Sequence, residues 1–181
     1  MHGSGLSSFQ KFATARFGIL HWEAIAREAG AKSHVYLPTQ IYPYGEALAL
    51  FAAAARYASV SSQQLQDQFG EYLAPAFLKL YRAMIPPEWT TLDIAANSVL
   101  IVHRVIRMRN SEAGAPKWNA VRVSDAEVQI TYSSRRGMCG LFVGVMRGFT
   151  SELGDVVDVS ESRCTHRGDD ACLIVLRRRA D

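Results

Sequence analysis

The chain has 181 residues, of which 49% are hydrophobic and 20% are charged, and its formal net charge is +3. This length suits one domain with a sizeable core, and the composition excludes a largely disordered chain. So small and dispersed a net charge argues against a nucleic-acid-binding protein. No apolar stretch reaches the length of a membrane span, and the first residues lack the pattern of a secretory signal, so we expect a cytoplasmic protein.

Two short helices are predicted at the start of the chain. Apolar residues recur at intervals of three and four over residues 6–13 and again over 22–29, which is the spacing of one helix face. Gly18 and Gly30 follow the two runs, and glycine commonly ends a helix. The sequence therefore predicts two helices separated by a glycine.

Three longer helices are predicted next. Residues 46–57 read as a largely buried helix, and a further helix begins at a cap formed by Ser61 or Ser62. Pro75 is predicted to interrupt that helix, because proline lacks the backbone N–H that the helix interior needs. Residues 91–109 form the longest predicted helix, and its two apolar stripes indicate that much of it is buried.

The second half of the chain changes to a pattern of strands around one helix. Apolar and polar residues alternate over residues 118–123 and 127–133, and again over 156–162 and 171–176, which predicts two β-hairpins. A helix is predicted between them, at residues 137–153. The predicted fold class is α+β: an N-terminal helical half, then a C-terminal half with an antiparallel β-sheet and a packed helix, all in one domain.

Three polar side chains at alternate positions mark the end of the second predicted strand: Tyr132, Ser134 and Arg136. Alternate residues of a strand point to the same face, so a phenol, a hydroxyl and a guanidinium would converge. The guanidinium fork suits a carboxylate, and the set suits a ligand with two neighbouring carboxylates, such as the propionates of a heme. The same pattern also fits an ordinary strand end with a packed tyrosine and a solvated arginine.

His103 lies on an apolar face of the longest predicted helix. Taken alone, such a histidine is more typical of a core residue than of a ligand. A buried imidazole stays neutral, however, and neutral imidazole is a good ligand for heme iron. Together with the polar set at the strand end, the position favours His103 as an axial iron ligand.

With these elements placed, the chain resembles the H-NOX family, the heme-nitric oxide/oxygen binding domains. The resemblance covers essentially the whole chain and rests on several motifs in the family's order and spacing. The motifs are Met1-His2-Gly3, Phe17-Gly18, Trp22-Glu23, Tyr42, Phe69-Gly70-Glu71-Tyr72, His103, Pro116-Lys117-Trp118, and the set Tyr132, Ser134 and Arg136.

The resemblance implies a heme b cofactor between the two halves of the chain. In that arrangement His103 binds the iron, Pro116 lies against the porphyrin, and Tyr132, Ser134 and Arg136 hold the propionates. The other predicted pocket residues are Phe9, Phe77, Leu78, Leu141 and Val145.

Gas selectivity is expected to follow from the distal side of that pocket. Oxygen-binding members of the family carry a distal tyrosine on the helix after the propionate motif. This chain has Cys139-Gly140-Leu141-Phe142 there and Val145 a turn later, and none of these side chains is a strong hydrogen-bond donor. The expected ligands are therefore NO and CO, with O2 excluded.

The three cysteines, Cys139, Cys164 and Cys172, lie in or beside the predicted second hairpin and the helix before it. Three thiols with Glu161 or His166 as a fourth ligand make a possible tetrahedral zinc site. Some members of the family carry such a zinc site, with a histidine at the position of Glu161. Buried unreactive thiols and a disulfide between Cys164 and Cys172 are the alternatives.

The predicted function is a stand-alone heme-based gas sensor that is not an enzyme. No nucleophile has a nearby base, and no phosphate-binding glycine loop appears. The signal is expected to pass, through release of the proximal histidine, to a partner protein such as a histidine kinase or a diguanylate cyclase. The alternative is a thiol or zinc redox-sensing module of the same fold, in which heme is absent or secondary.

Overall fold

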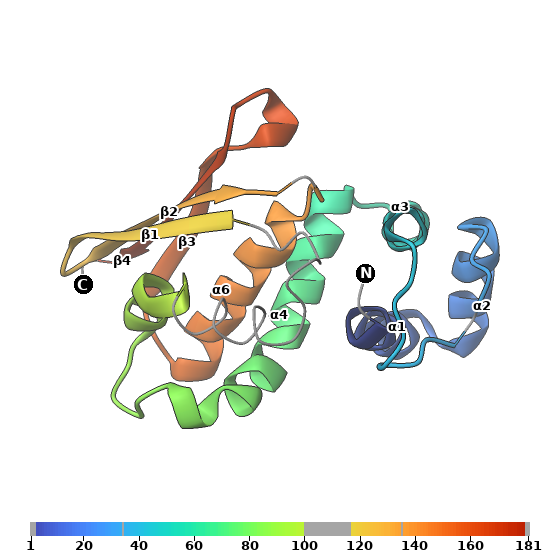
Figure 1. Ribbon diagram of the computed structural model, residues 1–181, viewed down its shortest axis with the longest axis horizontal. Coiled ribbons are helices and arrows are strands. Elements are labelled where there is room, and N and C mark those ends of the chain that lie inside the picture. The colour runs from blue at the N-terminus through green and yellow to red at the C-terminus, as the bar shows by residue number, and fades with distance from the viewer. Residues whose placement is uncertain (1–2, 34, 100–116, 135, 180–181) are drawn as a thin grey trace. The chain divides into compact units, whose positions relative to one another are not determined.

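The computed structural model describes residues 3–33, 35–99, 117–134 and 136–179, and Figure 1 shows the chain as a ribbon. The chain divides into two compact units, Met1–Phe69 and Gly70–Asp181. The first unit is helical, and the second contains the β-sheet, so the predicted α+β class is confirmed. The expectation of a single domain stays a prediction.

The first unit begins with the two predicted helices, α1 (Gly3–Phe17) and α2 (Ile19–Glu28). Gly18 separates them with a φ of 90°, a left-handed conformation that favours glycine. After the connecting segment comes α3 (Tyr44–Tyr57), which buries a row of alanine and larger apolar side chains. The predicted helices of the N-terminal half are thus present at the expected places.

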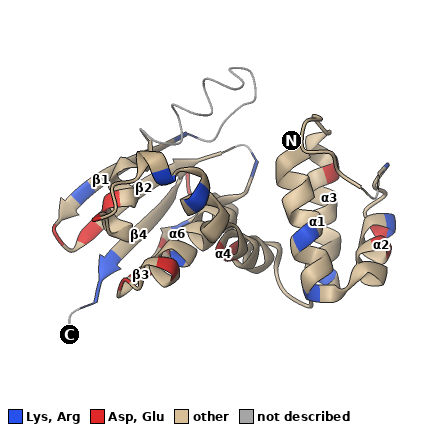
Figure 2. Ribbon diagram, turned by 90° about the horizontal axis from the view of Figure 1, so that it is seen from below, with Lys and Arg blue, Asp and Glu red and all other residues tan. Residues whose placement is uncertain are grey.

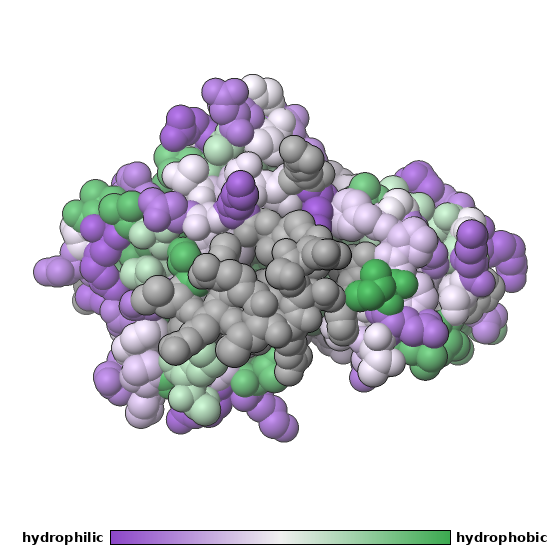
Figure 3. Space-filling model, viewed as in Figure 1, coloured by the Kyte–Doolittle hydropathy of each residue, from purple (hydrophilic) through white to green (hydrophobic). Residues whose placement is uncertain are grey.

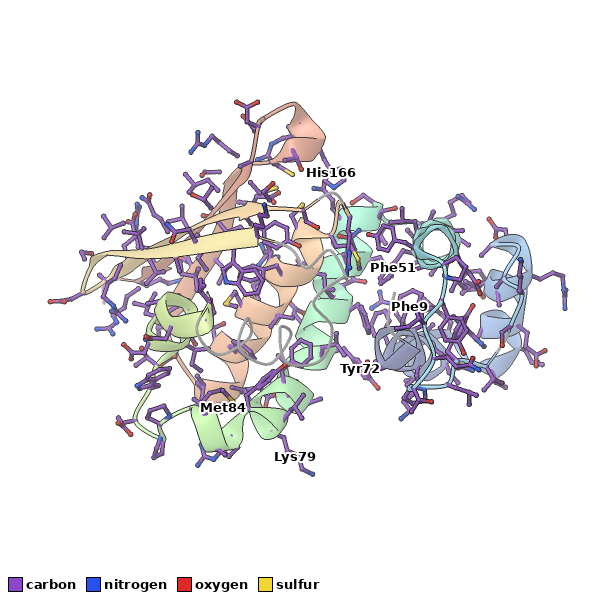
Figure 4. The ribbon with its side chains drawn as sticks, viewed as in Figure 1. Phe9, Phe51, Tyr72, Lys79, Met84 and His166 are labelled. Atoms are coloured by element: carbon purple, nitrogen blue, oxygen red, sulfur yellow. The ribbon has the colours of Figure 1, made fainter. Side chains whose placement is uncertain are left out.

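The core of the first unit is aromatic. The ring centroids of Phe9 and Phe51 lie 4.0 Å apart with the planes tilted by 31°, and Phe69 meets Phe9 edge-on at 5.2 Å. Trp22 also meets Phe9 edge-on, at 6.3 Å. All four side chains are almost fully buried, and Figure 4 labels Phe9 and Phe51 in this cluster. Such rings bury large apolar areas, so they hold the helices of this unit together.

Helix α4 runs from Ser62 to Leu80 and corrects one prediction. Its start is a capping box, because the backbone N–H of Gln64 donates to Ser61 Oγ at 3.1 Å and the Gln64 side chain accepts from the N–H of Ser61 at 2.9 Å. Pro75 was expected to interrupt the helix, but it lies inside it. Proline forfeits only one helical hydrogen bond, to the carbonyl of Glu71, and packing of the helix outweighs that loss.

The second unit is built on a four-stranded antiparallel sheet. Its strands are β1 (Lys117–Ser124), β2 (Glu127–Ser133), β3 (Val157–Arg163) and β4 (Cys172–Arg178), in the spatial order β1-β2-β4-β3. Both predicted hairpins are therefore present, and β2 and β4 form the centre of the sheet. The basic residues at the end of β4 are visible at the C-terminal edge (Figure 2).

Helix α6 (Cys139–Leu153) lies against one face of this sheet, with α4 beside it (Figure 1). Alternate residues of β2 and β4 are buried beneath α6, among them Ile130 and Ile174 at 0% exposure. This alternation produces one continuous core for the second unit. Within the described part of the chain, no helix is both long and apolar enough to cross a membrane.

A further helix begins at Thr91, and its described part ends at residue 99. Thr90 and Asp93 cap it reciprocally, with the N–H of Thr90 donating to the Asp93 carboxylate at 2.9 Å. Asp93 also pairs with Arg122 of β1 at 2.5 Å. Burial alone would raise the pKa of Asp93, but the hydrogen bonds from Thr90 and the nearby charge of Arg122 outweigh it and hold the pKa below 3.8.

Asp93→Ala is expected to lower the free energy of unfolding by about 1 kcal/mol at pH 7, because it removes the cap. A carboxylate whose pKa is depressed by folding stabilises the protein above its ordinary pKa and loses that effect as the pH falls. The difference from the wild type should therefore shrink as the pH falls below 3.8. Urea unfolding at pH 7 and pH 3 measures this, with exposed Asp170→Ala as the control. A difference that persists unchanged at the lower pH contradicts the role of the ionised carboxylate.

Candidate functional site

The predicted polar set lies where β2 ends and the chain turns towards α6. Tyr132 belongs to β2 and is 4% exposed, whereas the strand ends at Ser133, so Ser134 and Arg136 lie in the turn. The backbone N–H of Arg136 donates to Ser134 Oγ at 3.1 Å. The sequence pattern predicted that strand alternation would align the three side chains, but the strand ends before Ser134 and Arg136. These two residues lie instead in a turn that the Ser134 hydroxyl stabilises, which we call the polar turn.

An aromatic wall adjoins this turn. The rings of Tyr132 and Trp118 lie 5.3 Å and 5.6 Å from the ring of Phe142 on α6. The indole N–H of Trp118 donates to Ser98 Oγ at 3.1 Å, which joins β1 to the helix that begins at Thr91. These contacts fix the orientation of the rings, because a buried indole with a satisfied N–H has few alternative positions.

The predicted pocket residues of the second unit lie on two helices. Leu141 and Val145 are on α6, where Leu141 is half-buried and Val145 is 8% exposed. Phe77 and Leu78 are on α4 and pack against the core of the second unit. Their side chains and that of Phe142 carry no hydrogen-bond donor.

Three predicted heme contacts, Phe9, His103 and Pro116, are not among the described residues of the second unit. Phe9 is fully buried in the core of the first unit. His103 and Pro116 lie outside the described residues.

The three cysteines come together with Glu161. Cys139 begins α6, Cys164 precedes a short 3-10 helix (η2, Thr165–Arg167), Cys172 begins β4 and Glu161 lies on β3. The ligand atoms of the four residues all lie within 4.8 Å of one another. The Sγ atom of Cys164 is 3.7 Å from that of Cys139 and 3.9 Å from that of Cys172.

This spacing suits a tetrahedral metal ion. Sulfur ligands about 2.3 Å from zinc lie about 3.8 Å from each other in a tetrahedron, which matches the two measured separations. A disulfide would bring two sulfur atoms to about 2.05 Å, and none of the three buried cysteines forms one. The thiol arrangement is therefore compatible with a metal-ligand set or with buried reduced thiols, and not with a disulfide.

Glu161 fits the fourth position better than His166. Its Oε1 atom is buried and has no hydrogen-bond partner, while its Oε2 atom lies 3.8 Å from Arg167 Nη1. A buried carboxylate oxygen without a partner is costly unless a donor or a metal ion compensates it. His166 is exposed, and its Nε2 lies 3.1 Å from the carbonyl oxygen of Gly137. Within the described residues, the group around the three cysteines contains Glu161 and does not contain His166.

Burial sets the protonation of the thiols. Desolvation by burial and the charge of Glu161 raise the pKa of the Cys139 thiol, and desolvation by burial raises the pKa of the Cys164 thiol. The thiols of Cys139 and Cys164 are therefore protonated at neutral pH, and a metal ion has to displace those protons to bind. Metal affinity should accordingly rise with pH.

The comparisons with known proteins place the chain in a family. The sequence model of the Haem-NO-binding family matches residues 2–161. The chain belongs to the H-NOX family. Members share a heme-based gas-sensor fold. No curated protein sequence matches the chain.

Solved H-NOX structures share the fold of this chain at low sequence identity. The crystal structure of an H-NOX protein from S. oneidensis in the Fe(II)NO state has a TM-score of 0.88 at 18% identity, covering 99% of this chain and 100% of that one. The unliganded Fe(II) protein from K. algicida also has 0.88, at 16% identity, covering 100% and 98%. The NMR structure of the S. oneidensis domain in the Fe(II)CO state has 0.84, at 18% identity, covering 100% of each chain.

In this H-NOX chain, the polar turn and the cysteine cluster are neighbours. Tyr132 of β2 pairs in register with Cys172 of β4. Gly137 lies between Arg136 and Cys139 with a φ of 58°, and a Cβ atom there would come within 3.0 Å of the His166 ring. The left-handed backbone and this tight contact therefore favour glycine in the turn between the polar set and the cysteines.

Sequence reasoning missed the residues that support the cluster. The backbone N–H of Thr165 donates to Cys172 Sγ at 3.4 Å, and the N–H of Cys164 donates to the Asp169 carboxylate at 2.7 Å. Asp169 stands in the hairpin turn five residues after Cys164, where an aspartate is usual for its turn-forming side chain. That preference is the only signal that pointed to it.

Proposed function

We propose that this H-NOX chain is a heme b-based gas sensor, in which His103 binds the iron. The supporting observation is the polar turn of Ser134 and Arg136, which follows buried Tyr132 beside the apolar side chains of α6. Ser134 Oγ accepts the N–H of Arg136, which leaves its own hydroxyl proton to donate. The bound heme supplies an iron centre that takes up diatomic gases.

The polar turn would hold the charged edge of the cofactor. Arg136 would pair with a propionate, while the hydroxyls of Tyr132 and Ser134 donate to the pair. Hydrogen bonds to charged groups are worth about 1.5–3 kcal/mol each. The apolar side chains of Leu141, Phe142 and Val145 would exclude water from the porphyrin face.

We propose NO and CO as the ligands, with O2 excluded. A distal hydrogen bond to bound oxygen needs a donor, and the side chains of Leu141, Phe142 and Val145 offer none. The expected result is that the ferrous protein binds NO and CO and shows no stable oxygen complex in air. An oxygen complex that persists in air contradicts this selectivity.

The signal would leave through the predicted helix that carries His103, to a histidine kinase or a diguanylate cyclase, and the domain itself would perform no catalysis. Release of His103 from the iron would free that helix, and Pro116 would relax against the porphyrin. This is a two-state element that the ligand biases. His103→Gly with heme retained should reproduce the released state, and unchanged control of the partner by this variant contradicts the mechanism.

The absorption spectrum tests the heme proposal directly. Purified protein supplied with heme is expected to show a sharp Soret band that His103→Ala alters or abolishes, because the axial ligand sets the electronic state of the iron. His21→Ala is the matched control, since His21 is an exposed histidine on α2. A protein that takes up no heme, or a band that is the same in the His103 variant, contradicts the proposal.

A second candidate function is favoured by the cysteine cluster. We propose that Cys139, Cys164, Cys172 and Glu161 bind zinc, on the evidence of the sulfur separations and the unpartnered Glu161 oxygen. Metal analysis of the purified protein should find about one equivalent of zinc, and less than about a tenth of an equivalent rules out a structural site. If heme uptake also fails, a thiol or zinc redox-sensing module becomes the better description.

A further inference from the structure

A surface cavity of about 280 Å³ lies in the second unit, where α4 ends. Six of its eight lining residues are apolar, including Ile85, Trp89 and Leu153, and the other two are Lys79 and Arg82. We call it the α4-end cavity. It lies wholly within residues 78–153 and uses none of the cysteines or the residues of the polar turn.

Exposed apolar side chains occur among and close in sequence to the residues that line this cavity. Leu80 is 60% exposed, Met84 is 37% exposed and Leu153 is 39% exposed. Hydrophobic residues reach the surface in this region, at the lower edge of the second unit (Figure 3). Figure 4 shows Lys79 pointing away from α4 at the same end of the unit as Met84. Exposed apolar side chains at one end of a unit favour an interaction site there.

The two basic residues give the cavity a charge preference. Lys79 and Arg82 are exposed, and none of the ion pairs within the described residues includes either of them. Two unpaired cations beside an apolar floor favour a binding partner that places carboxylates around an apolar group.

We propose that the α4-end cavity is a docking site for a protein partner that inserts one large apolar side chain flanked by carboxylates. A free small ligand would fill the cavity but leave Leu80 and Met84 exposed, whereas a protein segment covers them as well. An anchor side chain in a pocket with polar contacts around it is the usual plan of an interface hot spot. The partner's role as receiver of a signal rests on the proposed sensor function, but the binding site does not.

The cavity is also placed to be affected by the sensor. Leu78 lines it and is at the same time one of the residues predicted to contact the heme, one position after Phe77 on α4. A small shift of this part of α4 would change both places at once, because packed helices move as units.

The tryptophan indole signals of the NMR spectrum provide a sharp test. The chain has three tryptophans, of which Trp89 lines the cavity while Trp22 and Trp118 are buried elsewhere. The probe is the synthetic peptide Asp-Glu-Phe-Glu-Asp, added to the full chain with and without heme. It should shift the Trp89 signal, identified by its loss in Trp89→Phe, and leave the other two unchanged.

Variants of both partners define what the shift means. The paired substitution Lys79→Glu and Arg82→Glu should weaken binding roughly tenfold, because it replaces two attractions by repulsions. The control pair Lys11→Glu and Lys32→Glu makes the same change of charge at exposed sites of the first unit and should have no effect. Replacing the peptide's phenylalanine by alanine, or its acids by lysines, should abolish the shift.

Four outcomes of the peptide titrations would overturn the proposal, and so would evidence that the cavity binds a second copy of the chain. The first is that the acidic peptide does not shift the Trp89 signal, and the second is that the lysine peptide shifts it equally. The third is that both charge-reversal pairs lose the same amount of peptide affinity. The fourth is that decanoate, a small apolar carboxylate, shifts the Trp89 signal while the peptide does not. A Trp89 signal that depends on protein concentration alone would assign the cavity to a second copy of the chain. If the Soret band is missing but the peptide still shifts Trp89, only the sensor proposal is contradicted. If the Soret band is present but the peptide shifts nothing, only the docking site is contradicted.

Discussion

Gly70→Ala is expected to lower the free energy of unfolding by about 1–3 kcal/mol or more, because it overpacks the contact between α4 and α6. A Cβ atom at Gly70 would lie 2.4 Å from the carbonyl oxygen of Leu141 and 2.6 Å from the backbone nitrogen of Val145. Both neighbours are backbone atoms, so no side-chain rotation relieves the clash and α6 itself has to move.

Urea unfolding followed by circular dichroism measures this effect, and the chain offers a matched control. Gly45 lies in the first turn of α3, and a Cβ atom there would meet nothing within 4 Å. Gly45→Ala should therefore be neutral or stabilise by up to about 1 kcal/mol, the difference in helix propensity. If both variants behave alike, the close approach of α4 and α6 is contradicted.

Cys164→Ser is expected to abolish zinc binding and to lower stability as much as a chelator lowers that of the wild type. Cys164 Sγ contacts both other thiols, so its loss removes the centre of the ligand set. A metal ion at a free concentration about a thousand times its dissociation constant stabilises the fold by about 4 kcal/mol. We expect Cys164→Ser to lower the free energy of unfolding by about this amount. Thermal unfolding with and without chelator, alongside metal analysis, provides the measurement.

The fourth ligand can be tested with two further variants. Glu161→Gln should reduce the zinc content, since an amide oxygen is a weaker ligand than a carboxylate. His166→Ala should leave it unchanged, because His166 contacts the Gly137 carbonyl rather than the cluster. The opposite pattern contradicts the assignment. A Cys164 variant that the chelator still destabilises places the metal elsewhere.

Much of the fold could be predicted because its signals are local. Helix α1 ends just before Gly18 and Ser61 caps the start of α4, as expected, since a positive φ and a capping box each depend on a few neighbouring residues. The two hairpins followed from alternation of apolar and polar residues. Pro75 was misjudged because a local rule counts the lost hydrogen bond but not the packing of the helix.

For the candidate sites too, some features could be predicted from the sequence and others could not. By itself, the sequence determined the family, the fold class and the residue types at the two sites, because motif order and periodicity are written along the chain. Only the tertiary structure showed that Glu161, and not His166, belongs to the group of close ligand atoms around the three cysteines, and that Ser134 and Arg136 lie in a turn. Those outcomes depend on which strands pair and how a loop closes, and such contacts between distant residues leave no periodic trace in the sequence.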